Sequence, residues 1–229
     1  PEPDIPACET WGNMELLSQE KEVIGIYISA HPLDDFKNEM IFCNATLKHF
    51  KEDLSKYEGV NLTFAAIITD VQHRVSKAGK GWAMFTMEDY GDSNEFRIFG
   101  EDYLRMKHFL TPNSFLFVRC TIQPGWTNKE GIKGEPRLKF TDFKLLHDIM
   151  DELCKKVTIR IQLQEIKEDT ILNLETILKN NPGKQSLNFT IWDAKEKIEV
   201  SLPSRNTKVK ISNELLATLK SQQINFKLN

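Results

Sequence analysis

The spacing of the apolar residues changes once along the chain, after Gly59, and this change constrains the fold more than any other feature. From Val60 to Thr69 apolar side chains occupy every even-numbered position, which is the period of a β-strand whose successive residues face opposite sides of a sheet. Similar alternation recurs further along. Five strands are predicted, at residues 60–69, 82–87, 95–99, 115–122 and 137–146. A short helix is predicted at 101–110, between the third and fourth strands.

Residues 1–58 carry helical spacing instead. Apolar residues recur every three or four positions across residues 11–28, which predicts an amphipathic helix. Pro32 ends that helix and suits the first position of a second, short helix over residues 33–40. A third helix is predicted to begin near Thr46.

Beyond Asp148 the pattern restarts in a module of about 80 residues, which is large enough to bury a core of its own. Its predicted elements are a strand at 156–164, a helix at 166–178, a turn at 181–183, strands at 186–192 and 197–202, a short strand near Val209, a helix capped by Ser212 and a last strand at 224–228. This mixture of helices and strands predicts a small α+β domain.

Five strands with one helix between the third and the fourth is the order of the OB-fold. This partly open barrel binds oligonucleotides with the face of its second and third strands and with two loops. We therefore predict an α+β chain in three parts. They are a helical linker segment (1–58), a five-stranded OB-fold β-barrel that forms a nucleic-acid-binding domain (59–150), and a small α+β C-terminal domain (151–229).

The composition is that of an ordinary globular chain, with 28% charged and 40% apolar residues, and it excludes a disordered one. The formal net charge is -3, which by itself argues against nucleic-acid binding, since such domains are usually basic. The charge is unevenly spread. Residues 1–58 hold 5 basic and 12 acidic side chains (-7), residues 59–150 hold 12 and 11 (+1), and residues 151–229 hold 13 and 10 (+3). The acidic excess therefore belongs to the first quarter.

The chain begins with Pro1 rather than with methionine, which suggests a segment cut from a longer protein. No apolar run approaches the roughly 18 residues of a membrane helix, and the start lacks the basic and apolar regions of a signal peptide. We therefore expect a cytoplasmic location. The four cysteines (Cys8, Cys43, Cys120 and Cys154) lack the spacing of a zinc site, so buried free thiols are expected.

Two predicted loops of the barrel are rich in basic residues. The first carries Arg74, Lys77 and Lys80 in a stretch without any acidic residue. The second, between the fourth and fifth strands, carries Lys129 and Lys133. These are the two loops with which an OB-fold holds oligonucleotides, and we predict that these five side chains contact phosphates. For either loop alone, an ordinary solvated, lysine-rich loop is the alternative interpretation.

Single-strand binding also needs exposed aromatic side chains on which bases stack, each stack contributing roughly 1 to 3 kcal/mol. Trp82 opens the second predicted strand beside the first basic loop, and Arg97 and Phe99 lie in the third strand. We predict that these three residues contact DNA. Trp126 stands in the second loop, where it either contacts DNA or covers the end of the barrel.

The sequence contains none of the common catalytic motifs: the phosphate-binding P-loop, the dinucleotide fingerprint, the zinc-protease helix or the nucleophile elbow. The adjacent acids Glu88 and Asp89 could suggest metal-dependent chemistry, which uses paired carboxylates. Neighbouring residues of a strand face opposite sides, however, and this pair stands where a strand ends in a turn, so a turn role is predicted. We predict no catalytic residue, no metal site and no cofactor in this chain.

Several segments resemble one known family. Residues 20–34, E-K-E-V-I-G-I-Y-I-S-A-H-P-L-D, resemble the segment E-K-E-x-L-G-x-Y-x-S-x-H-P-L-D of the alpha subunit of bacterial DNA polymerase III. Residues 76–80 (S-K-A-G-K), 85–89 (F-T-M-E-D) and 95–99 (E-F-R-I-F) resemble three further motifs of that subunit. The resemblance covers the whole chain in the order of its elements and is strongest up to about residue 120.

In that family the same order is a linker, an OB domain and the C-terminal domain that ends the subunit. The resemblance implies that the nucleotidyltransferase centre and its metal-binding aspartates lie upstream, so that the full-length subunit is an enzyme and this chain is a non-catalytic part of it. It also implies that the OB domain contacts single-stranded template DNA during replication. The C-terminal domain would bind the tau subunit of the clamp loader, within the rest of the polymerase holoenzyme.

From the sequence we therefore predict a binding region that holds the template strand and docks tau. A function of a different class stays open, in which the barrel is a protein-interaction scaffold of the replisome with little direct DNA contact. The near-neutral charge of residues 59–150 favours that alternative. The sequence also leaves open whether Leu215, Leu216 and Leu219 of the last helix serve tau or their own core.

Overall fold

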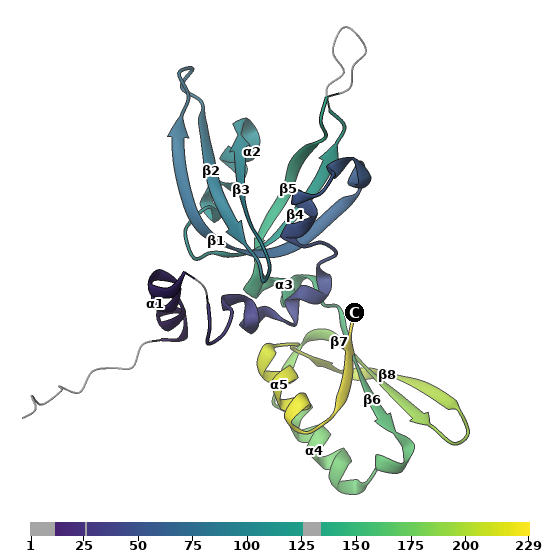
Figure 1. Cartoon of the computed structure of the whole chain (residues 1–229). Coiled ribbons are helices and arrows are strands. Elements are labelled where there is room, and N and C mark those ends of the chain that lie inside the picture. The colour runs from purple at the N-terminus through teal and green to yellow at the C-terminus, as the bar shows by residue number, and fades with distance from the viewer. Residues whose placement is uncertain (1–11, 26, 126–133) are drawn as a thin grey trace, which may run out of the picture. The chain divides into compact units, whose positions relative to one another are not determined.

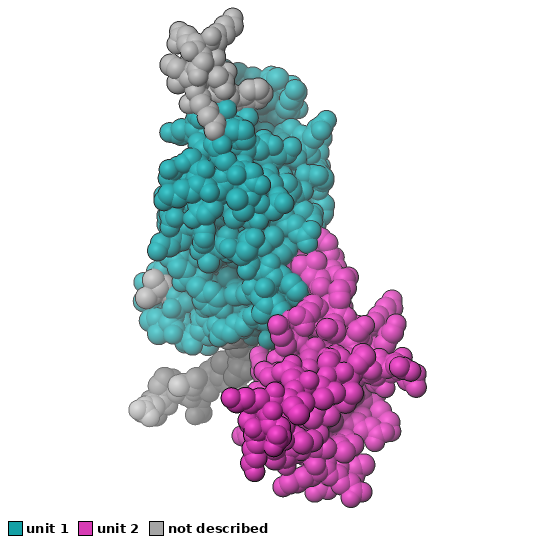
Figure 2. All heavy atoms as spheres, turned by 90° about the vertical axis from the view of Figure 1, so that its right-hand side faces the viewer, with its two compact units in different colours: residues 1–143 teal, residues 144–229 magenta. Residues whose placement is uncertain are grey.

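A computed structural model describes residues 12–25, 27–125 and 134–229 of the chain (Figure 1). The chain divides into two compact units, residues 1–143 and residues 144–229 (Figure 2). Each unit combines helices with a mostly antiparallel sheet, which confirms the predicted α+β class. None of the helices within the described ranges is long and apolar enough to cross a membrane.

The sheet of the first unit has five strands, each at a predicted place. They are β1 (Asn61–Val75), β2 (Gly81–Glu88), β3 (Ser93–Phe99), β4 (Phe115–Gln123) and β5 (Arg137–Leu145). Their order across the sheet is β3-β2-β1-β4-β5. The predicted helix between the third and fourth strands is present as α2 (Gly100–Met106), followed by one 3₁₀ turn.

The first strand is bent and serves both halves of the sheet. Residues 61–67 pair with β4, and residues 67–75 pair with β2. The register shifts between Ile68 and Asp70, so that a β-bulge forms at Thr69 and increases the local twist. No ladder joins β3 to β5 in the part of the chain that the structure describes, so the predicted five-stranded OB barrel is not confirmed.

The curled sheet encloses an aromatic core. Phe140 of β5 packs against Phe85 of β2 and Phe96 of β3, with ring centroids 5.8 and 5.5 Å apart. Phe143 meets Phe85 at 6.2 Å. The inward residues of β2 and β3 are almost completely buried, and Ile98 is only 3% exposed. These contacts place β5 opposite β2 and β3 across the core.

The described part of the segment predicted as a helical linker contains one α-helix and four 3₁₀-helices. They are α1 (Asn13–Ile24) and the 3₁₀-helices Pro32–Phe36, Glu39–Phe42, Leu47–Lys51 and Leu54–Tyr57. The α-helices predicted at 33–40 and near Thr46 are therefore wrong in type. Capping boxes close these short turns on themselves: the His31 ring accepts the N–H of Leu33 at 3.1 Å, and Asp34 accepts the N–H of His31 at 2.8 Å.

This segment packs on the sheet and belongs to the first unit. Leu47 is fully buried, and its N–H donates to the carboxylate of Asp89 at 2.7 Å. Phe50 packs its ring against Phe64 and Phe96, at centroid distances of 5.0 and 5.8 Å. The residues before β1 thus supply part of the core that the sheet alone leaves open.

The motif at residues 20–34 makes the turn that follows α1. The Glu20 carboxylate accepts the N–H groups of Ile28 and Ser29, each at 3.0 Å. Gly25 ends α1 with φ of 89°, a left-handed conformation that favours glycine. Lys21 forms an ion pair with Glu88 of β2 and so ties the helix to the sheet. The residues of the motif that carry the family resemblance here therefore stabilise the fold.

Asp34 holds the end of the same motif. It accepts a hydrogen bond from the Tyr90 hydroxyl at 3.0 Å and forms an ion pair with Lys37 at 2.7 Å. Its bonds to Lys37 and to the His31 N–H lower the pKa of Asp34 to about 2. The His31 ring packs on the Tyr90 ring with centroids 4.3 Å apart. Both partners of Tyr90 therefore come from the motif.

The second unit contains a four-stranded sheet in the order β8-β7-β6-β9. Its elements are α3 (Leu146–Leu153), β6 (Lys156–Gln162), a 3₁₀ turn (Leu163–Glu165), α4 (Glu168–Lys179), β7 (Pro182–Asp193), β8 (Ile198–Val209), α5 (Asn213–Ser221) and β9 (Asn225–Leu228). β6 pairs with β7 in parallel, and the other pairs are antiparallel.

Sequence reasoning missed α3 and placed a turn at 181–183, where β7 already begins at Pro182. It predicted the cap of α5 correctly, since the Ser212 hydroxyl accepts the N–H of Leu215 at 3.3 Å. Leu215, Leu216 and Leu219 are at most 1% exposed and so belong to the unit's own core.

The packing of residues 44–58 on the sheet can be tested by truncating one buried side chain. Leu47→Ala should lower the free energy of unfolding of the first unit by about 2 to 5 kcal/mol, because it removes a fully buried side chain and leaves a cavity. Ile41→Ala, at a side chain that is 52% exposed, should change it by less than about 0.5 kcal/mol. Urea unfolding followed by tryptophan fluorescence in a Trp192→Phe background measures both. Equal effects of the two variants would contradict this packing.

The lowered pKa of Asp34 predicts an acid dependence of stability. Because the pKa is about 2 in the folded chain and about 3.9 when unfolded, the ionised carboxylate stabilises the fold above about pH 4. This contribution is lost as the pH falls from about 4 to about 2. Asp34→Asn should flatten that part of the stability profile, measured by urea unfolding at each pH. Asp70→Asn, at an exposed carboxylate on β1, is the control. It should leave the difference in the free energy of unfolding between about pH 4 and about pH 2 the same as in the parent chain.

Candidate nucleic-acid interface

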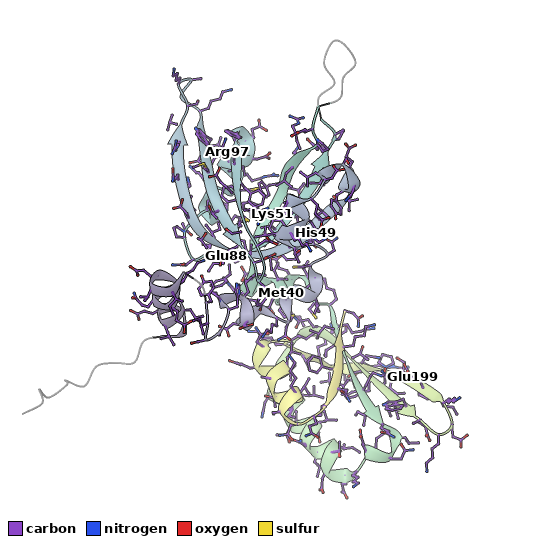
Figure 3. The ribbon with its side chains drawn as sticks, in the orientation of Figure 1. Met40, His49, Lys51, Glu88, Arg97 and Glu199 are labelled. Carbon is purple, nitrogen blue, oxygen red and sulfur yellow. The ribbon has the colours of Figure 1, made fainter. Side chains whose placement is uncertain are left out.

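Alternate residues of β1, β2 and β3 point away from the aromatic core. The register places Arg74 opposite Trp82, and Trp82 opposite Phe99, so these three residues form one row across the three strands. The adjacent row consists of Gln72, Met84 and Arg97. We call these six residues the outer face. Figure 3 labels Arg97 on β3.

The first row is a ladder of stacked side chains. The rings of Trp82 and Phe99 stack with centroids 5.3 Å apart and planes inclined by 19°. The guanidinium carbon of Arg74 lies 5.7 Å from the centroid of Trp82, in a cation–π contact. Phe99 is 57% exposed, although a side chain as large and apolar as phenylalanine is usually buried. An exposed aromatic stack of this kind is a surface on which bases can continue the stacking.

The hairpin loop 76–80 adjoins this row. The Ser76 N–H donates to the Lys80 carbonyl at 2.9 Å, and the Gly79 N–H donates to the Ser76 carbonyl at 2.9 Å. Gly79 has φ of 72°, where a side chain would be strained. This closed loop holds Lys77 and Lys80 on the surface, and neither lysine forms an ion pair with any described residue. Their charges are therefore available to an anionic ligand.

Helix α2 supports the hairpin from the inner side. A Cβ atom on Gly81 would lie 2.6 Å from a ring carbon of Tyr103, so a side chain at the first position of β2 would require that ring to shift. The Tyr103 hydroxyl also lies 3.2 Å from Nδ1 of His73. The strand pair that carries Arg74 and Trp82 is thus held by a side chain beneath it.

Part of the positive charge on the outer face is already neutralised. Arg97 forms an ion pair with Glu95 on the same strand, at 3.1 Å. Asp70, opposite Thr86, continues the face with a further carboxylate. Arg74 instead donates to the neutral amide of Gln72 at 2.6 Å. The positive charge is therefore concentrated at the hairpin end, beside the aromatic row.

The structure brings together six of the eight predicted contact residues. Arg74, Trp82, Arg97 and Phe99 share the outer face, and Lys77 and Lys80 adjoin it. Lys129 and Lys133, with Trp126, lie outside the described residues. The described ends of β4 and β5 lie at the same end of the unit as the hairpin (Figure 1). Sequence reasoning missed Gln72 and Met84, although Met84 shares the two-residue period of Trp82.

Of the acidic pair at the end of β2, Asp89 has the turn role predicted for both residues, whereas Glu88, the last residue of β2, forms an ion pair. Glu88 pairs with Lys21, and Asp89 accepts the N–H groups of Gly91 and Asp92 at 3.0 and 2.9 Å. Within the described ranges no three His, Cys, Asp or Glu side chains gather as a metal site would require.

The described cysteines are unpaired thiols. Cys120 and Cys154 are buried, and Cys43 is partly buried. Burial raises the pKa of Cys43 and of Cys120 to about 12. These thiols therefore stay protonated at neutral pH.

Comparison with known proteins identifies relatives for both units. A model of the family "DNA polymerase III alpha subunit, C-terminal domain" matches residues 157–229. DNA polymerase III subunit alpha of Saccharopolyspora erythraea is 29% identical over 118 residues, covering 50% of this chain and 10% of the relative. The subunit of Bacillus subtilis is 22% identical over 194 residues, with coverages of 83% and 16%. That of Chlamydia muridarum is 26% identical over 157 residues, with coverages of 68% and 12%.

Residues 157–229 match the C-terminal domain model of the DNA polymerase III alpha subunit, and most of the chain is similar to alpha subunits. The matches confirm the resemblance found in the sequence motifs. The chain spans only 10% to 16% of the length of these three relatives.

Proposed function

We propose that this chain is a non-catalytic binding region of a DNA polymerase III alpha subunit. In this proposal the first unit holds the single-stranded template on the outer face and the loop 76–80, and the second unit docks the tau subunit of the clamp loader. The observation that carries the DNA part is the row of Arg74, Trp82 and Phe99 beside two lysines that pair with no described acidic residue. Similarity to DNA polymerase III alpha subunits supports a replisome and cytoplasmic setting.

We also propose that the first unit is an OB-type barrel left open between β3 and β5. Five strands with α2 between the third and fourth support this assignment, as does a first strand shared between β4 and β2. The contacts of Phe140 with Phe85 and Phe96 bring β5 opposite β2 and β3, as such a barrel requires. In an OB-fold the face of β2 and β3 is the oligonucleotide face, and here it is the outer face.

Binding would combine stacking with charge. Bases would extend the stack of Trp82 and Phe99, while Arg74, Lys77 and Lys80 contact the phosphates that follow. Lys129 and Lys133 would add contacts from the second loop. Arg97 would have to exchange Glu95 for a phosphate, so its contribution should be smaller than that of Arg74. Such binding releases counterions and should weaken steeply with salt.

Docking of tau would use an apolar groove of the second unit. The groove has a volume of about 370 Å³ and lies between α4 and strands β7 and β8. Its walls include Leu174, Phe189, Ile191 and Leu202. Leu202 is 45% exposed, and its neighbour Val200 is 46% exposed. Exposed apolar surface beside a groove is typical of protein interaction sites, and the family match covers residues 157–229 of this unit.

A second candidate is that the first unit is a protein-interaction scaffold with little DNA contact. The ion pair of Arg97 with Glu95 and the nearby Asp70 favour it, because they lower the positive charge of the outer face. Mixing the chain with tau and with an oligonucleotide on a sizing column separates the two functions. Comigration with tau alone would favour the scaffold.

If single-stranded DNA binds the outer face, removing one aromatic side chain from the row should lower the affinity for DNA. Trp82→Ala and Phe99→Ala should each weaken binding of a labelled oligo-dT roughly 5- to 150-fold, the equivalent of one lost base stack. Fluorescence anisotropy at low salt measures the dissociation constant. Leu104→Ala, at a leucine that is 62% exposed on α2, is the matched control and should bind like the parent chain.

The lysines are tested by the salt dependence. Lys77→Ala with Lys80→Ala should reduce the slope of log affinity against log salt by about 1.4, because each phosphate contact contributes about 0.7 for a single strand. Lys48→Ala with Lys56→Ala removes the same charge from exposed positions outside the interface. An unchanged slope, or an equal change in both double variants, would refute the loop assignment.

If tau docks in the groove, a leucine of the groove lining should be needed for tau binding. A similarly exposed leucine outside the groove should not be needed. Leu202→Asp should abolish comigration with tau on a sizing column, because it places a charge in the apolar groove. Leu172→Asp makes the same change at a leucine of α4 that is 55% exposed and outside the groove lining. Comigration should survive in that variant. Survival in both would assign tau to another surface.

A further inference from the structure

The sheet of the second unit has two chemically different faces. On one face the side chains of Leu187, Phe189 and Ile191 meet α4, and α5 lies on the same side of the sheet (Figure 1). On the other face the alternate residues of the same strands are mostly polar. We call this second side the open face, because no described helix of the unit packs on it.

The open face carries an excess of positive charge. Lys156 of β6 and Lys208 of β8 flank Ser186 of β7 in one row across the sheet. Lys227 of β9 stands opposite Thr158. All three lysines are exposed, and none forms an ion pair with another described residue. Like charges held together without partners attract an anionic ligand.

An arginine and a tryptophan continue the same face. Arg160 lies with its guanidinium carbon 5.7 Å from the centroid of Trp192. It also pairs with Glu199 at 3.2 Å, and Figure 3 labels Glu199 on β8. Among the strand residues that the ladders pair, Glu199 is the one acidic residue on the open face. The same positions include four cations, Lys156, Arg160, Lys208 and Lys227. The net charge of the open face is therefore clearly positive.

Hydroxyl and amide groups fill the space between the cations. Asn188 is 6% exposed, and its amide donates to the Ser201 hydroxyl at 3.0 Å. Thr190 lies opposite both Arg160 and Ser201. Asn188 and Thr190 are buried, at 6% and 5% exposed. Ser186 and Ser201 are instead exposed, and their hydroxyls can bond to sugar and phosphate oxygens. The chemistry of the face thus suits a sugar-phosphate backbone.

We propose that the open face binds the phosphate backbone of a nucleic-acid strand. This contact is separate from the outer face of the first unit and from the apolar groove, which lies on the opposite side of the same sheet. The charge excess selects a polyanion, and Trp192 adds a ring on which a base can stack. The proposal therefore stands whether or not the outer face binds DNA.

Fluorine NMR of the full chain labelled with 5-fluorotryptophan tests the two faces separately. The chain has four tryptophans, and Trp→Phe variants assign their signals. Titration with oligo-dT at low salt should move the signal of Trp192 as well as that of Trp82. Movement of Trp82 alone would overturn the inference, and movement of Trp192 alone would overturn the outer face instead. If neither signal moves, both assignments fail.

Two double variants identify the charges responsible. Lys156→Ala with Lys208→Ala should raise the oligonucleotide concentration at half-shift of Trp192 by about 10-fold or more at low salt, because two phosphate contacts are lost. Lys167→Ala with Lys179→Ala removes two charges from the ends of α4 and should leave that concentration unchanged. Equal effects would mean that total charge, and not the open face, governs binding.

An acidic peptide is the competing ligand. Poly-aspartate at the same charge concentration should move the Trp192 signal much less than oligo-dT, since it offers neither bases to stack nor phosphate geometry. An equal movement with poly-aspartate would overturn the proposal in favour of a protein partner with an acidic segment.

Discussion

The β-bulge at Thr69 determines which residues of the first unit face outward. Before it the even-numbered residues of β1, such as Phe64 and Ile68, are buried, and after it the even-numbered Gln72 and Arg74 are exposed. The bulge is held where β1 leaves β4: the Ile68 N–H donates to the Ser114 carbonyl at 2.9 Å, and Ile68 accepts from the N–H of Asn113 at 2.7 Å. Without this shift Arg74 would point into the core, because a one-residue slip exchanges the faces of a strand.

The strands were predictable from the sequence because their burial has a period of two, whereas the linker was not. Its apolar residues are spaced as in an α-helix, but the capping residues His31 and Asp34 close the turns after a few residues. A 3₁₀ turn repeats every three residues, so a short helical pattern does not separate it from an α-helix. The fact that these turns complete the core of the sheet depends on contacts distant in sequence, such as Phe50 with Phe64.

The candidate nucleic-acid interface was likewise predictable from the sequence only in part. The alternation in β2 and β3 indicated that Trp82, Arg97 and Phe99 could share a face, and the loop charges were visible in the sequence. The single row of Arg74, Trp82 and Phe99 required the strand register, which the hairpin loop and the turn after Asp89 determine. The open face was missed for a related reason: its cations come from β6, β8 and β9, and their adjacency follows from the strand order.

Net charge is a poor guide to binding here because each unit presents its charges on separate faces. Exposed charges farther apart than about 8 Å are largely screened at physiological salt. A strand bound to the open face would therefore respond most to the cations on that face, such as Lys156 and Lys208. The net charge also counts the 12 acidic residues of the first 58. Some of those acids are already used in structure, as Asp34 is by Tyr90 and Lys37. The total of -3 is thus compatible with positive charge gathered on one face of each unit.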